Sequence, residues 1–256
     1  MRFDKAAALP GSGHGRETGV LPAEASAAGC LHEVHAVAGD WAAATAFALT
    51  MLGGAQAGAQ AGAIVTIRSA RGKLPASVYG ASVYGASVYG EGLIALGLAP
   101  ERLLLAHAAS NLEMLRAAAE AARCGGIAAV LVEMWGRCPE WGLTASRRLS
   151  LAAERSGVSV LILRGDAQEQ PSSAQTRWSI ASAPSIALSA NAPGLPAIDA
   201  HLLRQRGGPA GTHWRLEWDS EYGRFRTARS DEAALPGTVV PLSGLRAGSG
   251  AFSRAA

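Results

Sequence analysis

Short apolar segments alternate with helix-like segments along the chain, and this alternation limits the possible folds more than any other feature. The apolar segments are rich in Val, Ile and Leu and lie at 63–68, 102–106, 127–133 and 158–163. Helices are predicted at 111–123, with Ser110 as N-cap, and at 144–155, with Thr144 as N-cap. Strands that alternate with helices form a mainly parallel sheet with helices on its faces. The sequence therefore predicts an α/β fold.

A different pattern begins after residue 175, where strands follow one another without helices between them. Strands are predicted at 176–181, 201–206 and 213–219. The last of these alternates strictly, so one side should face the core through Trp214, Leu216 and Trp218. Its other side should face water through Arg215, Glu217 and Asp219. We expect these strands to extend the sheet in an antiparallel manner.

The length of 256 residues suits one large domain with tails, and the hydrophobic share of 49% excludes a wholly disordered chain. We predict a flexible N-terminal arm at 1–28, a domain at 29–229 and a flexible tail at 230–256. No stretch is apolar for long enough to cross a membrane, and the first residues lack the apolar segment of a signal peptide. Three cysteines without a paired spacing favour a reducing compartment. These features predict a cytoplasmic protein.

The segment where a nucleotide-binding α/β protein carries its phosphate loop has unsuitable residues. That loop needs the pattern G-x-x-x-x-G-K-[ST], because backbone N–H groups and the Lys hold the phosphates. The matching stretch at 35–45 has one Gly and no Lys, and the only two lysines of the chain are Lys5 and Lys73. Asp40 would place a negative charge beside the phosphate. The sequence therefore predicts no bound cofactor and no ATPase activity.

Few other residues invite a catalytic or metal-binding interpretation. Glu133 ends an apolar segment as a Walker B carboxylate does, although many buried strands end in one polar residue. His32 and His35 lack Cys or acidic partners at metal-ligand spacing, so we interpret them as surface or loop residues. The patterns G-x-S-x-G and H-E-x-x-H are absent. We predict no catalytic residue and no metal site.

The formal net charge of +3 is too small to indicate nucleic-acid binding by itself, but the charge is unevenly distributed. The excess of basic residues lies after residue 170, and all of them there are arginines. A candidate contact with DNA or a partner is formed by Arg204, Arg206, Arg215, Arg224 and Arg226. Acidic residues among them fit a solvated hairpin equally well. A second candidate partner contact is Arg147 with Arg148, whose alternative is a solvated helix face.

A spaced set of short motifs is shared with a known family. The motifs are LHEV at 31–34, YGEGL at 89–93, LGLAPERL at 96–103, LTASRRL at 143–149, LAAE at 151–154, LR at 163–164, TRW at 176–178 and LLRQRGG at 202–208. Together they resemble the ImuA family, the RecA-like accessory proteins of the bacterial mutagenesis cassette. The resemblance covers about residues 29–229.

The resemblance implies a RecA-like core and a role in translesion DNA synthesis during the SOS response to DNA damage. Its implied partners are RecA, the polymerase-like protein ImuB and the error-prone replicative-type polymerase of the cassette, with DNA contacted directly or through them. The family is also similar to the cell-division inhibitor SulA. Three copies of Ala-Ser-Val-Tyr-Gly occupy 76–90, and only the third fits the family pattern. We therefore interpret the first two copies, at 76–85, as an insert.

Three functional hypotheses follow from the residues and the resemblance. The first is a non-enzymatic adaptor that binds RecA and the cassette polymerases. The alternatives are a RecA-like, ATP-dependent DNA-binding protein and a SulA-like inhibitor of cell division. The missing phosphate-binding lysine favours the adaptor.

Overall fold

The computed structural model of the protein describes residues 28–37, 40–56, 62–69, 90–165, 169–188, 190 and 192–228. Apart from residue 28, the arm predicted at 1–28 lies outside these ranges. The insert predicted at 76–85 and the tail predicted at 230–256 lie outside them as well.

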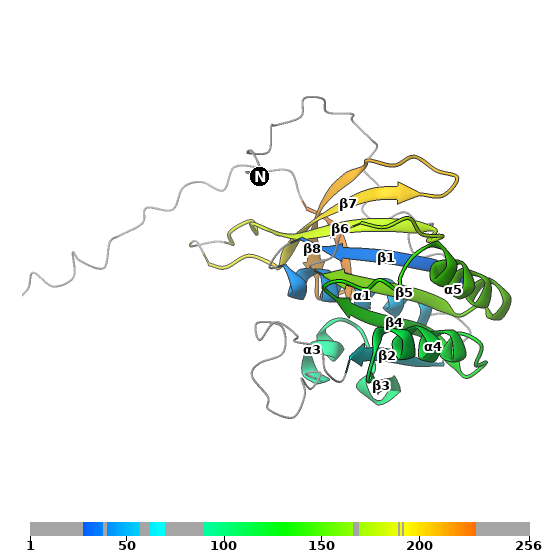
Figure 1. Cartoon of the computed structure of the whole chain (residues 1–256). Helices are drawn as coiled ribbons and strands as arrows, with labels where there is room; N and C mark the ends of the chain where they lie inside the picture. The colour runs from blue at the N-terminus through cyan, green and yellow to red at the C-terminus, as the bar shows by residue number, and fades with distance from the viewer. Residues whose placement is uncertain are drawn as a thin grey trace, which may run out of the picture.

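The described residues form nine strands in a single sheet, with helices packed on it (Figure 1). The strands are β1 (Leu31–Ala36), β2 (Ala63–Ser69), β3 (Leu103–Ala108), β4 (Ile127–Trp135), β5 (Ser159–Gly165), β6 (Thr176–Ala183), β7 (Ala197–Gln205), β8 (His213–Asp219) and β9 (Arg224–Thr227). The helices are α1 (Trp41–Gln56), α3 (Gly90–Ala95), α4 (Asn111–Ala121) and α5 (Leu143–Ser156), with a 3-10 turn, η2, at Pro100–Arg102.

The order of the strands across the sheet is β3-β2-β4-β5-β1-β6-β7-β8-β9. Strands β1 to β6 pair in parallel, whereas β7, β8 and β9 each run antiparallel to the strand before them. The predicted α/β class, with a mainly parallel sheet and antiparallel C-terminal strands, is confirmed. The antiparallel part begins one strand later than predicted. The chain crosses over β1 between β5 and β6, and such a crossover makes β6 parallel to β1.

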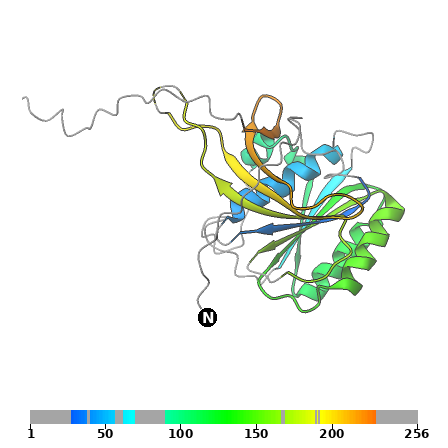
Figure 2. The same ribbon diagram turned by 90° about the horizontal axis from the view of Figure 1, so that it is seen from above.

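Helices cover both faces of the sheet. Figure 2 shows the blue helix α1 on one side and the green helices α4 and α5 on the other. On the α1 side, Phe47 packs with Trp178 and with Phe225 of β9, so the antiparallel strands close over this helix. On the other side, Met114 and Leu149 pack on the central strands. Burial of these apolar side chains supplies the main stabilisation of each layer.

Local sequence signals fix the ends of α4 and α5. The hydroxyl of Ser110 accepts the backbone N–H of Glu113 at 3.3 Å, which confirms the predicted N-cap of α4. Gly157 ends α5 with a φ of +77°, a left-handed conformation that glycine adopts without strain. The N-cap predicted at Thr144 is wrong, because α5 begins at Leu143 directly after Gly142.

Candidate functional site

The carboxyl ends of the parallel strands are where ligands bind in α/β sheets of this kind, so a nucleotide, if one were bound, would lie at this edge. Strands β1, β4 and β5 are neighbours there. Only four residues, 37–40, join β1 to α1, and the phosphate loop pattern alone spans eight. The backbone N–H of Asp40 donates to Val37 O at 2.9 Å, and Asp40 O accepts from Ala44 at 3.1 Å, so α1 begins directly after this carboxylate.

Two indole rings cover this edge on the α1 side. Trp41, the first residue of α1, is 4% exposed, and its ring meets that of Trp135 edge-on with centroids 4.5 Å apart. Both rings lie against Gly165 at the end of β5, where even a single added methyl group would overlap with them. Aromatic side chains therefore occupy the space next to the strand ends and the amino end of α1.

A buried ion pair lies close by in the same sheet. Glu133 was interpreted as the last residue of its strand, but β4 continues to Trp135. Its carboxylate accepts a hydrogen bond from Arg68 Nη2 at 2.9 Å, and both side chains are almost fully buried. Glu133 therefore holds a neighbouring strand through Arg68, and a hydrolytic role is not needed to explain its position.

A second group of buried charged residues lies on the opposite face, toward α5. Glu33 is fully buried in β1, and its Oε2 accepts a hydrogen bond from Arg177 Nε at 2.6 Å. Arg177 also donates to Gln170 O and to Ser172 Oγ. Arg164 at the end of β5 is 1% exposed, and burial lowers the pKa of its guanidinium. This group brings together charged side chains from β1, β5 and β6, of which β1 is distant in sequence from the other two.

The interpretation of His32 and His35 as surface or loop residues is wrong. Both lie in β1 and are buried, because β1 occupies the middle of the sheet between β5 and β6. His32 Nδ1 shares a hydrogen bond of 2.8 Å with Thr176 Oγ1. His35 Nε2 lies 3.6 Å from Glu33 Oε2. Among the described residues no group of three His, Cys, Asp or Glu side chains is arranged to hold a metal ion.

The pH dependence of stability should report on Glu33. Burial raises the pKa of this carboxyl, but the nearby His35 and the charge of Arg177 outweigh burial, so its pKa lies below the usual value. A lowered folded-state pKa stabilises the protein fully above the unfolded pKa of about 4.3, and this contribution is lost as the pH falls below it. We expect a fall from neutral to acid pH to lower the free energy of unfolding more in the native protein than in the Glu33→Gln variant. Urea unfolding at each pH measures both losses. Equal losses in the two proteins would contradict this role.

Most of the C-terminal candidate arginines are engaged within the protein. Both carboxylate oxygens of Asp199 accept hydrogen bonds from Arg215, at 2.9 and 2.8 Å. Arg204 Nη1 donates to Ser172 O at 2.7 Å, and the guanidinium of Arg224 lies 5.2 Å from the ring centroid of Tyr222. Arg206 is exposed. The structure therefore does not gather these residues into one free basic surface.

Arg226 explains why Glu217 is buried although it was predicted to face water. It lies in β9, which the sequence did not predict, directly opposite Glu217 of β8. Its guanidinium lies 3.9 Å from the carboxylate of Glu217 and 3.8 Å from that of Asp219. Glu217 was expected to face water, but it is only 6% exposed because β9 covers it. Trp214, Leu216 and Trp218 do face the core as predicted, Trp214 being partly buried.

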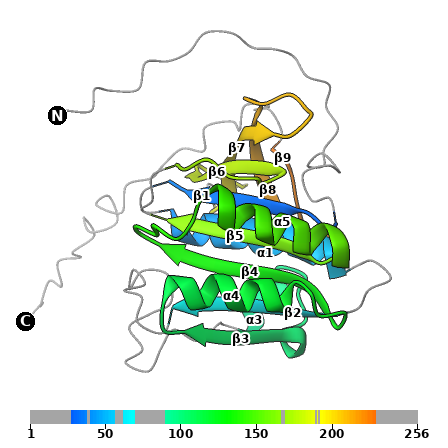
Figure 3. The same ribbon diagram turned by 45° about the vertical axis from the view of Figure 1, so that its right-hand side comes forward.

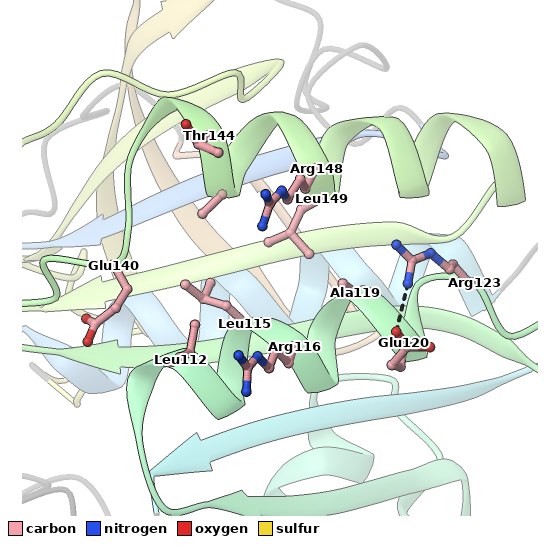
Figure 4. A pocket seen from close by; sticks show the side chains of 11 residues that line it. Leu112, Leu115, Arg116, Ala119, Glu120, Arg123, Glu140, Thr144, Arg148 and Leu149 are labelled. Atoms are coloured by element: carbon pink, nitrogen blue, oxygen red, sulfur yellow. Dashed lines mark hydrogen bonds and ion pairs between the residues drawn. The ribbon is translucent and has the colours of Figure 1, made fainter.

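A groove runs between α4 and α5, which lie side by side on the sheet (Figure 3). It has a volume of about 470 Å³ and a largely apolar floor that includes Leu115, Ala119 and Leu149. Arg148 from α5 and Arg116 from α4 lie along its sides (Figure 4). A second hollow of about 390 Å³ continues past Arg148 to Arg155. Arg147 is exposed but does not line either hollow. Of the two neighbouring candidates, only Arg148 therefore belongs to the groove.

Two arginines of this groove and one of the second hollow were not predicted as contacts, although a signal for them is present in the sequence. Arg116 and Arg123 are seven residues apart within the helix predicted at 111–123, although α4 ends at Ala121, and Arg148 and Arg155 are seven apart on α5. A spacing of seven returns a side chain to the same face of a helix after two turns. The four arginines could therefore have been predicted to form two basic stripes. The two stripes border neighbouring hollows because α4 and α5 lie side by side, and this depends on the strand order, which could not be predicted from the sequence.

Comparisons with known proteins leave the family of the chain open. No model of a protein family and no curated protein matches it. Among solved structures, one that it resembles is entitled "Crystal structure of the RadB recombinase", at 16% sequence identity and a TM-score of 0.48. The match covers 76% of this chain and 89% of the other. A likeness at this level says nothing of activity. In the described part of the chain no helix is long and apolar enough to cross a membrane.

Proposed function

We propose that the protein is a non-enzymatic adaptor with a RecA-like core, which binds RecA and the polymerase subunits of a mutagenesis cassette in the cytoplasm during translesion DNA synthesis. The resemblance to the ImuA family supplies the process and the partners. The observation that carries the adaptor role is the pair of indole rings, Trp41 and Trp135, packed on Gly165 at the strand ends.

The same edge is chemically unsuited to a nucleotide phosphate. A phosphate placed at the amino end of α1 would meet the carboxylate of Asp40, and the stretch 35–45 offers no lysine to offset the repulsion. A nucleotide would also have to displace Trp41, whose burial removes a large apolar surface from water. Both effects oppose ATP binding at this position.

The outer face of α4 and α5 supports a binding role instead. Three leucines are more exposed there than is usual for this residue, namely Leu112 at 44%, Leu143 at 58% and Leu151 at 40%. Leu112 lines the groove and Leu151 the second hollow, and exposed apolar side chains bordered by charged ones are typical of protein interaction sites. DNA is reached through the partners, because Arg215 and Arg226 are paired with carboxylates.

We expect the purified full-length protein to co-purify with RecA and with an ImuB-like polymerase homologue. Both should be tested separately, with the third polymerase added afterwards, and circular dichroism should show that the protein is folded. Failure of a folded protein to bind either partner would reject the adaptor.

We expect no thermal stabilisation by ATP and magnesium. A ligand at about 100 times its Kd stabilises a protein by about 2.7 kcal/mol, which a thermal shift measurement resolves. RecA in the same buffer serves as the positive control. A dose-dependent rise in the melting temperature of this protein would favour the ATP-dependent alternative.

A further inference from the structure

We infer that the groove between α4 and α5 binds an amphipathic helix of a partner protein that carries leucine-like residues on one side and carboxylates beside them. This inference deepens the proposed adaptor function and rests on it only for the choice of a protein as occupant. The groove offers both halves of such a site. Its floor is apolar, through Leu115, Ala119 and Leu149, and its sides carry guanidinium groups.

The charges along the groove are available to a partner. Arg116 and Arg148 are both exposed, and neither makes an ion pair with another described residue. Arg123 pairs with Glu120 at 2.8 Å, but both side chains are more than half exposed, and such a pair is worth little. An incoming carboxylate could therefore exchange with Glu120 at small cost. Arg155 extends the basic side into the second hollow.

The shape and the floor favour a helix over a nucleic acid. Helix-in-groove recognition places apolar side chains at intervals of three and four residues into an apolar channel. A phosphate backbone would gain nothing from the leucines of the floor, and it would meet the carboxylates of Glu120 and Glu140. Nucleic-acid sites instead show a continuous positive surface.

The distribution of charge also sets the direction of the bound helix. Glu140 lies at one end of the groove and Arg123 at the other (Figure 4). The helices α4 and α5 both point their carboxyl ends toward Arg123, so the negative ends of their dipoles oppose a carboxylate there, and the arginines must outweigh them. Arg123 and Arg148 line both hollows, so the carboxylates of the partner should concentrate toward them and away from Glu140.

Three synthetic probes test this assignment by fluorescence anisotropy at about 0.15 M salt. The first is a helical peptide of 14 residues, the same number as in α5, with Leu on one face and Glu beside it. The second has every Glu replaced by Lys, and the third is a single-stranded DNA oligomer. We expect the full-length protein to bind the Glu peptide and to bind the Lys peptide and the DNA more weakly.

Charge reversal in the groove provides the decisive comparison. The double variant Arg116→Glu/Arg148→Glu is expected to bind the Glu peptide at least about tenfold more weakly and the Lys peptide more tightly than the native protein does. Arg147→Glu is the matched control, since it changes the neighbouring exposed residue of the same helix outside the groove, and its affinity should stay within about twofold. Arg116→Gln/Arg148→Gln replaces the double variant if the latter does not fold.

Three results would overturn the inference. These are no binding of the Glu peptide, equal binding by the groove variant and the native protein, or tighter binding of DNA that is lost in the groove variant. The proposed function and the groove are rejected by different outcomes. If the native protein binds the peptide but neither RecA nor the polymerase homologue, the adaptor is rejected and the groove stands. If the groove variant still binds RecA and the polymerase homologue as the native protein does, the groove is rejected as their site.

Discussion

Glu33→Ala should lower the free energy of unfolding by about 3–5 kcal/mol, because it leaves a buried guanidinium without its carboxylate. Arg177 loses its 2.6 Å hydrogen bond with Glu33, and Arg164, which is also buried nearby, loses the stabilising negative charge. Removing one partner of a buried pair costs far more than the pair contributes, since the remaining charge cannot reach water. Urea unfolding at neutral pH measures the loss.

Two controls isolate the buried charge as the cause. Glu120→Ala removes a carboxylate from an exposed pair of similar length, 2.8 Å to Arg123, and should change the stability by no more than about 0.5 kcal/mol. The double variant Glu33→Met/Arg177→Met removes both charges and should be more stable than Glu33→Ala. A loss below about 1 kcal/mol in Glu33→Ala would show that the charged group contributes little to the fold.

Trp178→Ala is the second substitution with a large expected effect, also about 3–5 kcal/mol. The indole is fully buried in β6, and its ring centroid lies 5.4 Å from that of Phe47 in α1 and 5.5 Å from that of Trp214 in β8. Its Nε1 donates to Thr176 Oγ1 at 3.0 Å. The truncation would leave a cavity where the helix, the parallel sheet and the antiparallel strands meet. Thermal unfolding followed by far-UV circular dichroism measures the loss.

Comparison variants separate the cavity from the hydrogen bond. Trp178→Phe keeps an aromatic ring and loses the N–H, so it should recover a large part of the stability. Tyr222→Ala removes a ring that is 63% exposed and should change the stability by no more than about 0.5 kcal/mol. If Trp178→Ala and Tyr222→Ala were equally stable, Trp178 would not be the centre of this core.

The elements that the sequence predicted well are those whose signals are local. Strands β2, β4 and β5 are continuous apolar segments, and the ends of α4 and α5 are marked by Ser110 and Gly157. Strand β9 was missed because its four residues, Arg-Phe-Arg-Thr, contain a single apolar side chain. It forms because it pairs with β8, and a strand of that kind is not visible in a short sequence window.

The candidate site was less predictable because its residues meet only through the sheet. Glu33 and Arg177 are 144 positions apart, and only the pairing of β1 with β6 brings them together. His35 was misinterpreted for the same reason, since a polar residue in a central strand looks like a surface residue when its neighbours are unknown. Arg204 and Arg215 were predicted as contacts with DNA or a partner, but the hydrogen bonds that they form with Ser172 and Asp199 could not be foreseen.

The central position of β1 affects the order in which a ribosome-bound chain can fold. On one side β1 pairs with β5, and on the other it pairs with β6, so the early segment at 31–36 joins the two halves of the sheet. Its register partners lie well over a hundred residues later, which gives the protein many non-local contacts and predicts slow folding. During synthesis, the side of β1 that pairs with β6 must stay unpaired until Thr176 to Ala183 have left the exit tunnel. Chaperone dependence in the cell should therefore be greatest for chains stalled before that point.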